Sequence, residues 1–338
     1  MDGAAEPPSD EDSRQVGVTR AARLRHALRP RGRLDGGSVR IPGRVPVAPL
    51  QPEWLIVDHL PLFHRYHVPD PGSTDPDTSE TASTDAIVHV HGFGISGTYL
   101  EPTAAVLASR YRTYVPDLPG MGRSLRPKHG LDLQGLARVV IDYCDTVGVE
   151  KPILVGNSLG CPVIIEVAAS FPDRVKSAVL VSPAGGPNNQ PLGRALRQMA
   201  QDGYREPIGM LPIATRDYLR FGVLQSLSLF KAMTAYPTLE NLHLLDAPTL
   251  VIAGARDPLV KFSNAFVLAA LPHVSAVKVP GAHALNFSAP ELVAELIHAH
   301  LTGQSLLDGA LAGGVAEMVE VYHAEPPPPG RTGHRRPR

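Results

Sequence analysis

The chain has 338 residues, and its 32 lysines and arginines against 33 aspartates and glutamates give a formal net charge of -1. A chain without a basic surplus is a poor match for nucleic acid, so we expect no nucleic-acid partner. Hydrophobic residues make up 43% of the sequence and charged residues 19%, which suits a large globular core and excludes a wholly disordered protein.

The two cysteines, Cys144 and Cys161, are too few for a disulfide framework and fit a reducing compartment. No apolar run approaches the ~18 residues that a membrane span needs. The acidic, proline-containing residues 1–10 are not followed by the apolar segment of a secretory signal. We therefore expect a cytoplasmic protein without stable membrane insertion.

The composition of both ends of the chain predicts tails outside the globular core. Residues 1–50 are rich in arginine and proline and predict a disordered tail, although apolar residues at helical spacing over 21–28 leave open a short basic amphipathic helix. Residues 303–338 include four consecutive prolines and several terminal arginines, and they predict a second, flexible tail.

Between the tails, short runs rich in β-formers alternate with helical periodicity, which is the pattern of an α/β protein with a mostly parallel sheet. The expected strands are residues 55–58, 62–68, 86–90, 113–116, 153–155, 178–181, 250–253 and 276–279. The expected helices are residues 100–110, 133–147, 161–171, 264–271 and 290–301. The first two strands are separated by a short turn and predict an antiparallel edge, and residues 70–85 predict an exposed loop.

One stretch interrupts this alternation. Residues 183–246 show helical periodicity and no convincing strand. The sequence therefore predicts a core made of residues 51–182 and 247–302, with a helical insertion between them.

The strongest local motif is Gly156-Asn157-Ser158-Leu159-Gly160. It is a G-x-S-x-G sequence between an expected strand and an expected helix, the context in which a serine is presented on a sharp turn. Gly156 and Gly160 remove side chains that would collide across such a turn. Ser158 is then a candidate nucleophile at the N-terminus of a helix, whose backbone N–H groups and dipole favour negative charge.

A serine needs a base and an orienting acid. Asp257 follows the expected strand 250–253, and His283 follows the expected strand 276–279. Because the carboxyl ends of parallel strands share one edge of the sheet, we expect both side chains near Ser158. Asp246 is a rival acid, but it precedes its strand. We therefore expect His283 to move the serine proton and Asp257 to orient the imidazole.

Negative charge on a tetrahedral intermediate requires backbone donors. We expect one from the N–H of Leu159 and the other from the N–H of Phe93, in the loop after the strand 86–90. The residues that support these loops are His91, Gly92, Gly94, Gly156, Asn157 and Gly160.

A few other residues are weaker candidates for metal binding, reactivity or substrate binding. His89 and His91 lie on one strand face, but no further ligand stands at metal-binding spacing, so we expect neither metal nor cofactor. Cys161 is either reactive or a small packing residue. Ser96 and Ser124 either donate to substrate or are solvated loop hydroxyls.

In order and spacing, the His91-Gly92 loop, residues 117–124, the Ser158 elbow, Asp257 and His283 resemble the α/β-hydrolase superfamily over about residues 52–302. The resemblance implies an eight-stranded, mostly parallel sheet with helices on both faces and a helical cap inserted after the sixth strand. Haloalkane dehalogenases and epoxide hydrolases carry aspartate at the elbow, so Ser158 implies acyl chemistry through an acyl-enzyme.

Asn157 in the elbow makes the chain similar to hydrolases of ring meta-cleavage products, which break a C–C bond beside a ketone. Those enzymes usually have a tryptophan directly after the catalytic histidine, where this chain has Ala284. Carboxylic ester hydrolysis is therefore the broader expectation, with a small or medium apolar substrate, because residues 183–246 supply many apolar side chains and three of the six methionines. The alternatives are a C–C hydrolase of dienoate-type diketones, a ligand-binding receptor with little turnover, and a cofactor-free peroxidase.

Overall fold

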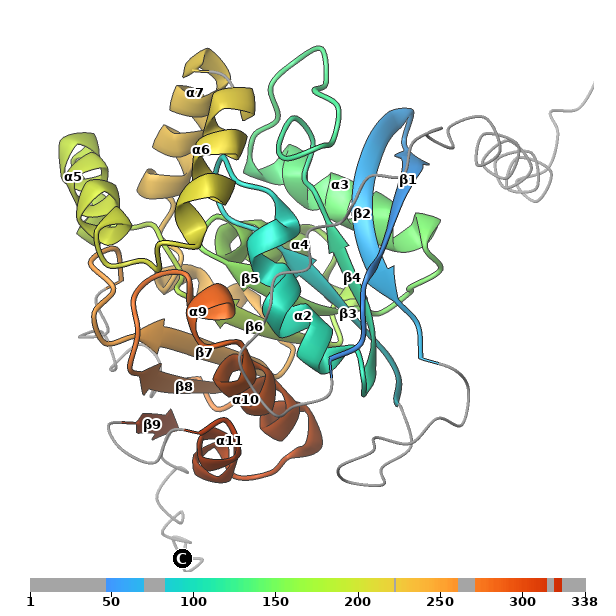
Figure 1. Cartoon of the computed structure of the whole chain (residues 1–338), viewed down its shortest axis with the longest axis vertical. Helices are drawn as coiled ribbons and strands as arrows, with labels where there is room; N and C mark the ends of the chain where they lie inside the picture. The colour runs from blue at the N-terminus through green and yellow to red at the C-terminus, as the bar shows by residue number, and fades with distance from the viewer. Residues whose placement is uncertain (1–46, 70–82, 222, 261–270, 315–318, 324–338) are drawn as a thin grey trace, which may run out of the picture.

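The structure is a computed structural model that describes residues 47–69, 83–221, 223–260, 271–314 and 319–323 (Figure 1). The expected N-terminal tail up to residue 46 lies outside the described residues. So do residues 264–270 of one expected helix and residues 70–82 of the expected loop.

A nine-stranded sheet forms the centre of the molecule, in the order β1-β2-β4-β3-β5-β6-β7-β8-β9 (Figure 1). The strands are β1 (Gln51–Val57), β2 (Leu60–His67), β3 (Ser83–Val90), β4 (Tyr111–Pro116), β5 (Ile153–Asn157), β6 (Ser177–Val181), β7 (Thr249–Gly254), β8 (Val274–Val279) and β9 (Glu320–His323). Strands β4, β3, β5, β6, β7 and β8 are parallel, and the antiparallel strands are at the two edges. The mostly parallel α/β sheet is confirmed, and all eight expected strands are present.

Local sequence explains why these segments are strands. Val57 pairs with Leu60 across a two-residue turn, in which Asp58 and His59 have φ angles of 42° and 68°. Positive φ at both positions is the geometry of a tight hairpin turn whose twist matches that of its strands. Strands β5, β6 and β7 are buried along their whole length, as their unbroken apolar runs predict.

Helices cover both faces of the sheet. Helices α3 (Leu133–Thr146) and α4 (Gly160–Ser170) pack on one face. Helices α2 (Glu101–Leu107), α10 (Pro290–Thr302) and α11 (Leu306–Ala312) pack on the other. The remaining short helical turns outside the insertion are η1 (Gly97–Leu100), η2 (Pro172–Arg174) and α9 (Leu285–Ser288).

Between β6 and β7 the chain leaves the sheet and forms a helical insertion (Figure 1). It contains η3 (Pro187–Asn189), α5 (Leu192–Gly203), α6 (Met210–Phe221), α7 (Val223–Ala235) and η4 (Glu240–Leu244). Residues of α5, α6 and α7 share a cavity with the loops that follow β3, β5, β7 and β8. The insertion therefore stands over the carboxyl ends of the parallel strands.

The expectation of a flexible tail from residue 303 onward is wrong for two segments. Leu306 and Ala310 of α11 are buried against the α10 face of the sheet. Strand β9 adds to the edge of β8, where Val321 pairs with Val277. These elements are short, with seven and four residues, and they lie among glycines and prolines. Segments this short show no hydrophobic periodicity from which a helix or a strand could be predicted.

Candidate active site

Ser158 lies on a strained turn between β5 and α4, with a φ angle of 54°. The turn depends on the two glycines of the motif. A Cβ on Gly156 would lie 2.7 Å from the backbone of Gly160, and a Cβ on Gly160 would lie 2.1 Å from the carbonyl oxygen of Val90. Only glycine permits this approach, so the motif folds the way its sequence predicts.

Asp257 and His283 meet at the same edge of the sheet. The loops after β7 and β8 approach so closely that a Cβ on Gly254 would lie 2.4 Å from the Ala282 carbonyl oxygen. His283 Nδ1 donates to Asp257 Oδ2 at 2.7 Å, and Asp257 Oδ1 accepts from the Leu259 backbone N–H at 2.8 Å. The carboxylate is thus held in place while it orients the imidazole, which leaves Nε2 as the free ring nitrogen.

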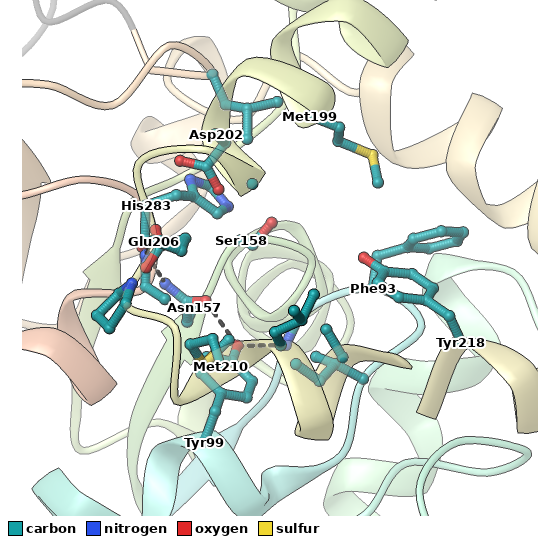
Figure 2. Close-up of a pocket in the computed structure, with 18 of the residues that line it drawn as sticks. Phe93, Tyr99, Asn157, Ser158, Met199, Asp202, Glu206, Met210, Tyr218 and His283 are labelled. Carbon is teal, nitrogen blue, oxygen red and sulfur yellow. Dashed lines mark hydrogen bonds between the residues drawn. The ribbon is translucent and has the colours of Figure 1, made fainter. Parts of the chain in front are cut away.

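Ser158 and His283 line one cavity of about 430 Å³ beneath the inserted helices (Figure 2). The core also contributes Gly92, Phe93 and Asn157. The insertion contributes mainly apolar side chains, which include Met199, Met210, Leu211, Tyr218 and Met233. The structure therefore brings Ser158, His283 and Phe93 together around one cavity, with Asp257 behind His283.

Two backbone N–H groups beside Ser158 are without a backbone acceptor in the described part of the chain, namely those of Phe93 and Leu159. Leu159 follows Ser158 directly and is buried, and Phe93 lies on the cavity wall. These are the two donors that the sequence predicts for a developing oxyanion.

A hydrogen-bonded chain through Tyr99 joins the loops of the site, as the dashed lines in Figure 2 show in part. The Gly92 N–H donates to the Tyr99 hydroxyl at 2.8 Å, and this hydroxyl donates to Asn157 Oδ1 at 2.6 Å. Asn157 Nδ2 in turn donates to the carbonyl oxygen of His283 at 3.3 Å. Asn157 therefore ties the loop after β3 to the histidine loop, and its partner Tyr99 was not predicted from the sequence.

His91 and Gly94 shape the loop after β3. His91 Nδ1 donates to the Gly92 carbonyl at 2.8 Å, and its Nε2 accepts from the Leu118 N–H at 2.8 Å, so both ring nitrogens are used inside the protein. Gly94 has a φ angle of 69°, and a Cβ there would lie 2.7 Å from the ring of Tyr218. Both ring nitrogens of His91 are thus occupied, whereas those of the buried His89 make no hydrogen bond within the described part of the chain.

Carboxylates surround His283. Burial lowers the pKa of its imidazole, but the charge of Asp257, the hydrogen bond to it, and the nearby Asp202 and Glu206 outweigh burial and raise the pKa to about 9. Asp202 and Glu206 come from the insertion and lie beside His283 in the cavity (Figure 2). Sequence reasoning missed both, because no spacing rule links the end of α5 to a loop after β8.

The weaker candidates have structural roles. Ser96 is buried and bonded to Asp217 of α6, and the Ser124 hydroxyl donates to the Asp117 carbonyl at 2.6 Å. Cys161 is fully buried, and burial raises the pKa of its thiol well above the usual value, which is opposite to a reactive thiolate. Among the residues that the structure describes, no group of three or more His, Cys, Asp or Glu side chains is arranged to hold a metal ion.

Comparison with known proteins places the chain in a family. The model of the alpha/beta hydrolase family matches residues 87–296, which include the elbow, the acid and the histidine. The chain therefore belongs to the alpha/beta hydrolase family. No helix in the described ranges has the length and apolar character of a membrane span.

The individual relatives carry the names of different activities. The chain is 28% identical to a putative non-heme haloperoxidase of Mycobacterium phage D29, over 64% of this chain and 88% of that one. It is 33% identical to a 2-hydroxy-6-oxononadienedioate/2-hydroxy-6-oxononatrienedioate hydrolase of Paraburkholderia phymatum, over 39% of this chain and 47% of that one. The structure of a membrane phospholipase A, a bacterial virulence factor, superposes with a TM-score of 0.64 at 22% identity, covering 85% and 92% of the two chains, and shows a shared fold.

Proposed function

We propose that this protein is a serine hydrolase that cleaves carboxylic esters of small or medium apolar molecules through an acyl-enzyme. The observation that carries the proposal is the 2.7 Å bond between His283 Nδ1 and Asp257 Oδ2, with Ser158 on a positive-φ turn in the same cavity. A serine, a histidine with a free Nε2 and a buried carboxylate are the parts that acyl transfer requires.

In the proposed reaction, Ser158 Oγ attacks the ester carbonyl carbon as its proton passes to His283 Nε2. The C–O bond to the alcohol then breaks, and His283 returns the proton to the departing oxygen. Water next attacks the acyl-enzyme, again giving its proton to His283, and the acid leaves as Ser158 regains its proton. Asp257 stays ionised throughout and stabilises the imidazolium.

The N–H groups of Phe93 and Leu159 would stabilise the oxyanion formed in each half-reaction. Their directions are fixed by the elbow and by the chain of hydrogen bonds through Tyr99 and Asn157. Prepositioned donors of this kind contribute about 3 kcal/mol each to transition-state stabilisation, because they need not reorganise during the reaction.

In this proposal, residues 183–246 act as a cap that closes over the substrate. The cavity wall supplied by this segment is largely apolar, with Met199, Met210 and Met233 among its side chains. Flexible thioethers pack against varied apolar shapes, which supports an apolar acyl group. We also propose a cytoplasmic location, which suits the two buried free cysteines.

A C–C hydrolase is the second candidate, favoured by Asn157 in the elbow and by the similarity to the dienedioate hydrolase. The two candidates share the nucleophile and differ in the leaving group, which is an alcohol oxygen in one and a carbanion carbon in the other. Direct comparison of p-nitrophenyl esters with a dienoate diketone, followed through loss of its yellow colour, separates them.

Mass spectrometry after exposure to a fluorophosphonate tests the shared machinery, with turnover of p-nitrophenyl esters measured on the same preparation. We expect one label, on the peptide that contains Ser158, and steady ester turnover. Labelling with near-stoichiometric cleavage would favour a ligand-binding role, and absence of both labelling and turnover would reject the proposed function.

A further inference from the structure

Two carboxylates of the insertion, Asp202 and Glu206, have no part in the proposed reaction. Asp202 lies in the last turn of α5 and Glu206 follows shortly after the helix ends. Glu206 Oε1 accepts from the backbone N–H of Ala284, the residue after the histidine, at 2.7 Å. Figure 2 shows both side chains on the His283 side of the cavity, with Phe93 and Tyr218 across from them.

One oxygen of each carboxylate, Oδ1 of Asp202 and Oε2 of Glu206, is buried and makes no well-aligned hydrogen bond in the described part of the chain, although the backbone N–H of His283 is close enough to lower the pKa of both groups. Asp202 as a whole is only 9% exposed, and it lines the cavity. A buried carboxylate oxygen without a hydrogen bond is costly, so such oxygens in folded proteins normally face a donor from a ligand or a neighbour.

The rest of the cavity wall is mostly apolar, and the Tyr218 hydroxyl is one of the few other polar groups on it. Around the two carboxylates the walls are formed by apolar residues such as Met199, Pro207, Ile208, Met210 and Leu259. An apolar pocket with a few convergent polar groups fixes the orientation of its ligand through those groups. Here the spare acceptors converge beside the imidazole.

The position beside His283 decides which part of a substrate meets these oxygens. In the proposed reaction, His283 Nε2 hands its proton to the departing alcohol oxygen, so the alcohol part must lie on the histidine side. We infer that Asp202 and Glu206 form a subsite for a hydrogen-bond donor, a hydroxyl or an ammonium group, on the alcohol part of the ester. This inference rests on the proposed function and narrows its substrate class to esters of donor-bearing alcohols.

Two pairs of butanoate esters test the subsite, because each pair has nearly one shape and differs in the donor. The first pair is 2-hydroxyethyl against propyl butanoate, and the second is 2-(dimethylamino)ethyl against 3-methylbutyl butanoate. The quantity measured is the ratio of kcat/KM within each pair at pH 8, because burial raises the pKa of Asp202 to about 7 and the carboxyl must be ionised. This ratio is divided by the ratio of alkaline hydrolysis rates to remove intrinsic reactivity. We expect a corrected ratio of about tenfold or more in at least one pair, the size of a hydrogen bond to a charged group.

Replacing the acceptor should remove the preference. Asp202→Leu should reduce the ratio to about one, and Glu206→Gln should reduce it in the ammonium pair while its amide oxygen still accepts from Ala284. Gln201→Leu is the matched control, since Gln201 is an exposed neighbour on the same helix, and it should leave the ratio unchanged. Because the ratio compares two esters on one variant, a general change in His283 basicity cancels.

The results of these assays distinguish a protein without the subsite from a protein that is not a hydrolase. Wild-type protein that hydrolyses all four esters with corrected ratios near one overturns the subsite and leaves the hydrolase intact. A preference that survives in Asp202→Leu, a variant whose folding is checked by circular dichroism, overturns it as well. Failure to hydrolyse any ester, together with an unlabelled Ser158, rejects both the hydrolase and the subsite.

Discussion

At the scale of single residues, the backbone of Ser158 is the least relaxed part of the proposed machinery. A non-glycine residue at a φ angle of 54° is unfavourable by about 1–3 kcal/mol, and such strain persists only where the surroundings impose it. Val181 accepts the Ser158 N–H at 3.1 Å, and the glycines on both sides prevent any relief. The strain therefore holds the hydroxyl toward the cavity.

Two substitutions at Ser158 separate strain from chemistry. Ser158→Ala and Ser158→Gly should both lose fluorophosphonate labelling and at least about 1,000-fold in kcat, since both remove the nucleophile. Glycine accepts positive φ, so Ser158→Gly should unfold with a free energy about 1 kcal/mol greater than that of Ser158→Ala, as measured by urea denaturation. Equal stability of the two variants would contradict the strain argument.

The raised pKa of His283 should give kcat/KM an unusual dependence on pH. A protonated imidazole cannot accept the serine proton, so kcat/KM for an apolar ester should rise with pH until the pKa of about 9 is passed. At pH 7 the value should be about 1% of the plateau, since each pH unit below the pKa costs about tenfold. Rates of Ser158→Ala provide the background of spontaneous hydrolysis.

Glu206→Gln tests the cause of that profile. Removing one negative charge beside the imidazole lowers the pKa of His283, so the acidic limb of the kcat/KM profile should move to lower pH and activity at pH 7 should rise. An unmoved limb would show that Glu206 does not contribute, and would leave the basicity of the histidine to Asp257 and Asp202.

At the scale of elements, helix α6 is anchored to the loop that carries Phe93. The buried carboxylate of Asp217 in α6 accepts from the Ser96 N–H at 2.8 Å and from the Ser96 hydroxyl at 2.5 Å. Burial raises the pKa of Asp217, but hydrogen bonds from Arg216 and Ser96 lower it more, so the carboxylate stays charged. The insertion and the donor loop thus hold each other in position.

Asp217→Ala should therefore affect both stability and turnover. It leaves the buried Ser96 N–H without its acceptor, and the free energy of unfolding should fall by about 2–3 kcal/mol. Looser placement of the Phe93 N–H should reduce kcat by about tenfold with a smaller change in KM. Arg220→Gln is the control, because Arg220 is exposed on the same helix and should leave both quantities unchanged. Unchanged urea denaturation of Asp217→Ala would argue against the anchor.

The elements also show which parts of the structure could be predicted. Ser158 directly follows β5, and Asp257 and His283 lie in the loops just after β7 and β8, so local pattern and the geometry of a parallel sheet were enough to predict that they meet. Asp217 meets Ser96 across 121 positions, and Glu206 meets Ala284 across 78. Contacts over such separations depend on how the inserted helices fold back, and no periodicity in the sequence encodes that.

At the scale of the whole molecule, strand β9 protects one edge of the sheet. It pairs with β8 from Ser275 to Lys278, and α11 packs in the core just before it. An uncovered strand edge presents unpaired N–H and C=O groups that can pair with another molecule.

A shortened chain tests this protection. A chain that ends at residue 314 keeps α11 and loses β9, so we expect it to self-associate, as measured by light scattering after size-exclusion chromatography. A chain that ends at residue 323 keeps the strand and should behave like the full sequence. Identical size distributions for both shortened chains would mean that β9 does not protect the edge.

The position of β9 also bears on how the sheet is assembled during synthesis. From β5 outward, strands β6, β7, β8 and β9 are added in the order in which the ribosome makes them. Each of these strands pairs with the strand made just before it, and β9 is the last of them to be synthesised. The segment with Ser158 is therefore made before the segment with His283, and the edge of β8 can be paired only after residues 320–323 have been translated.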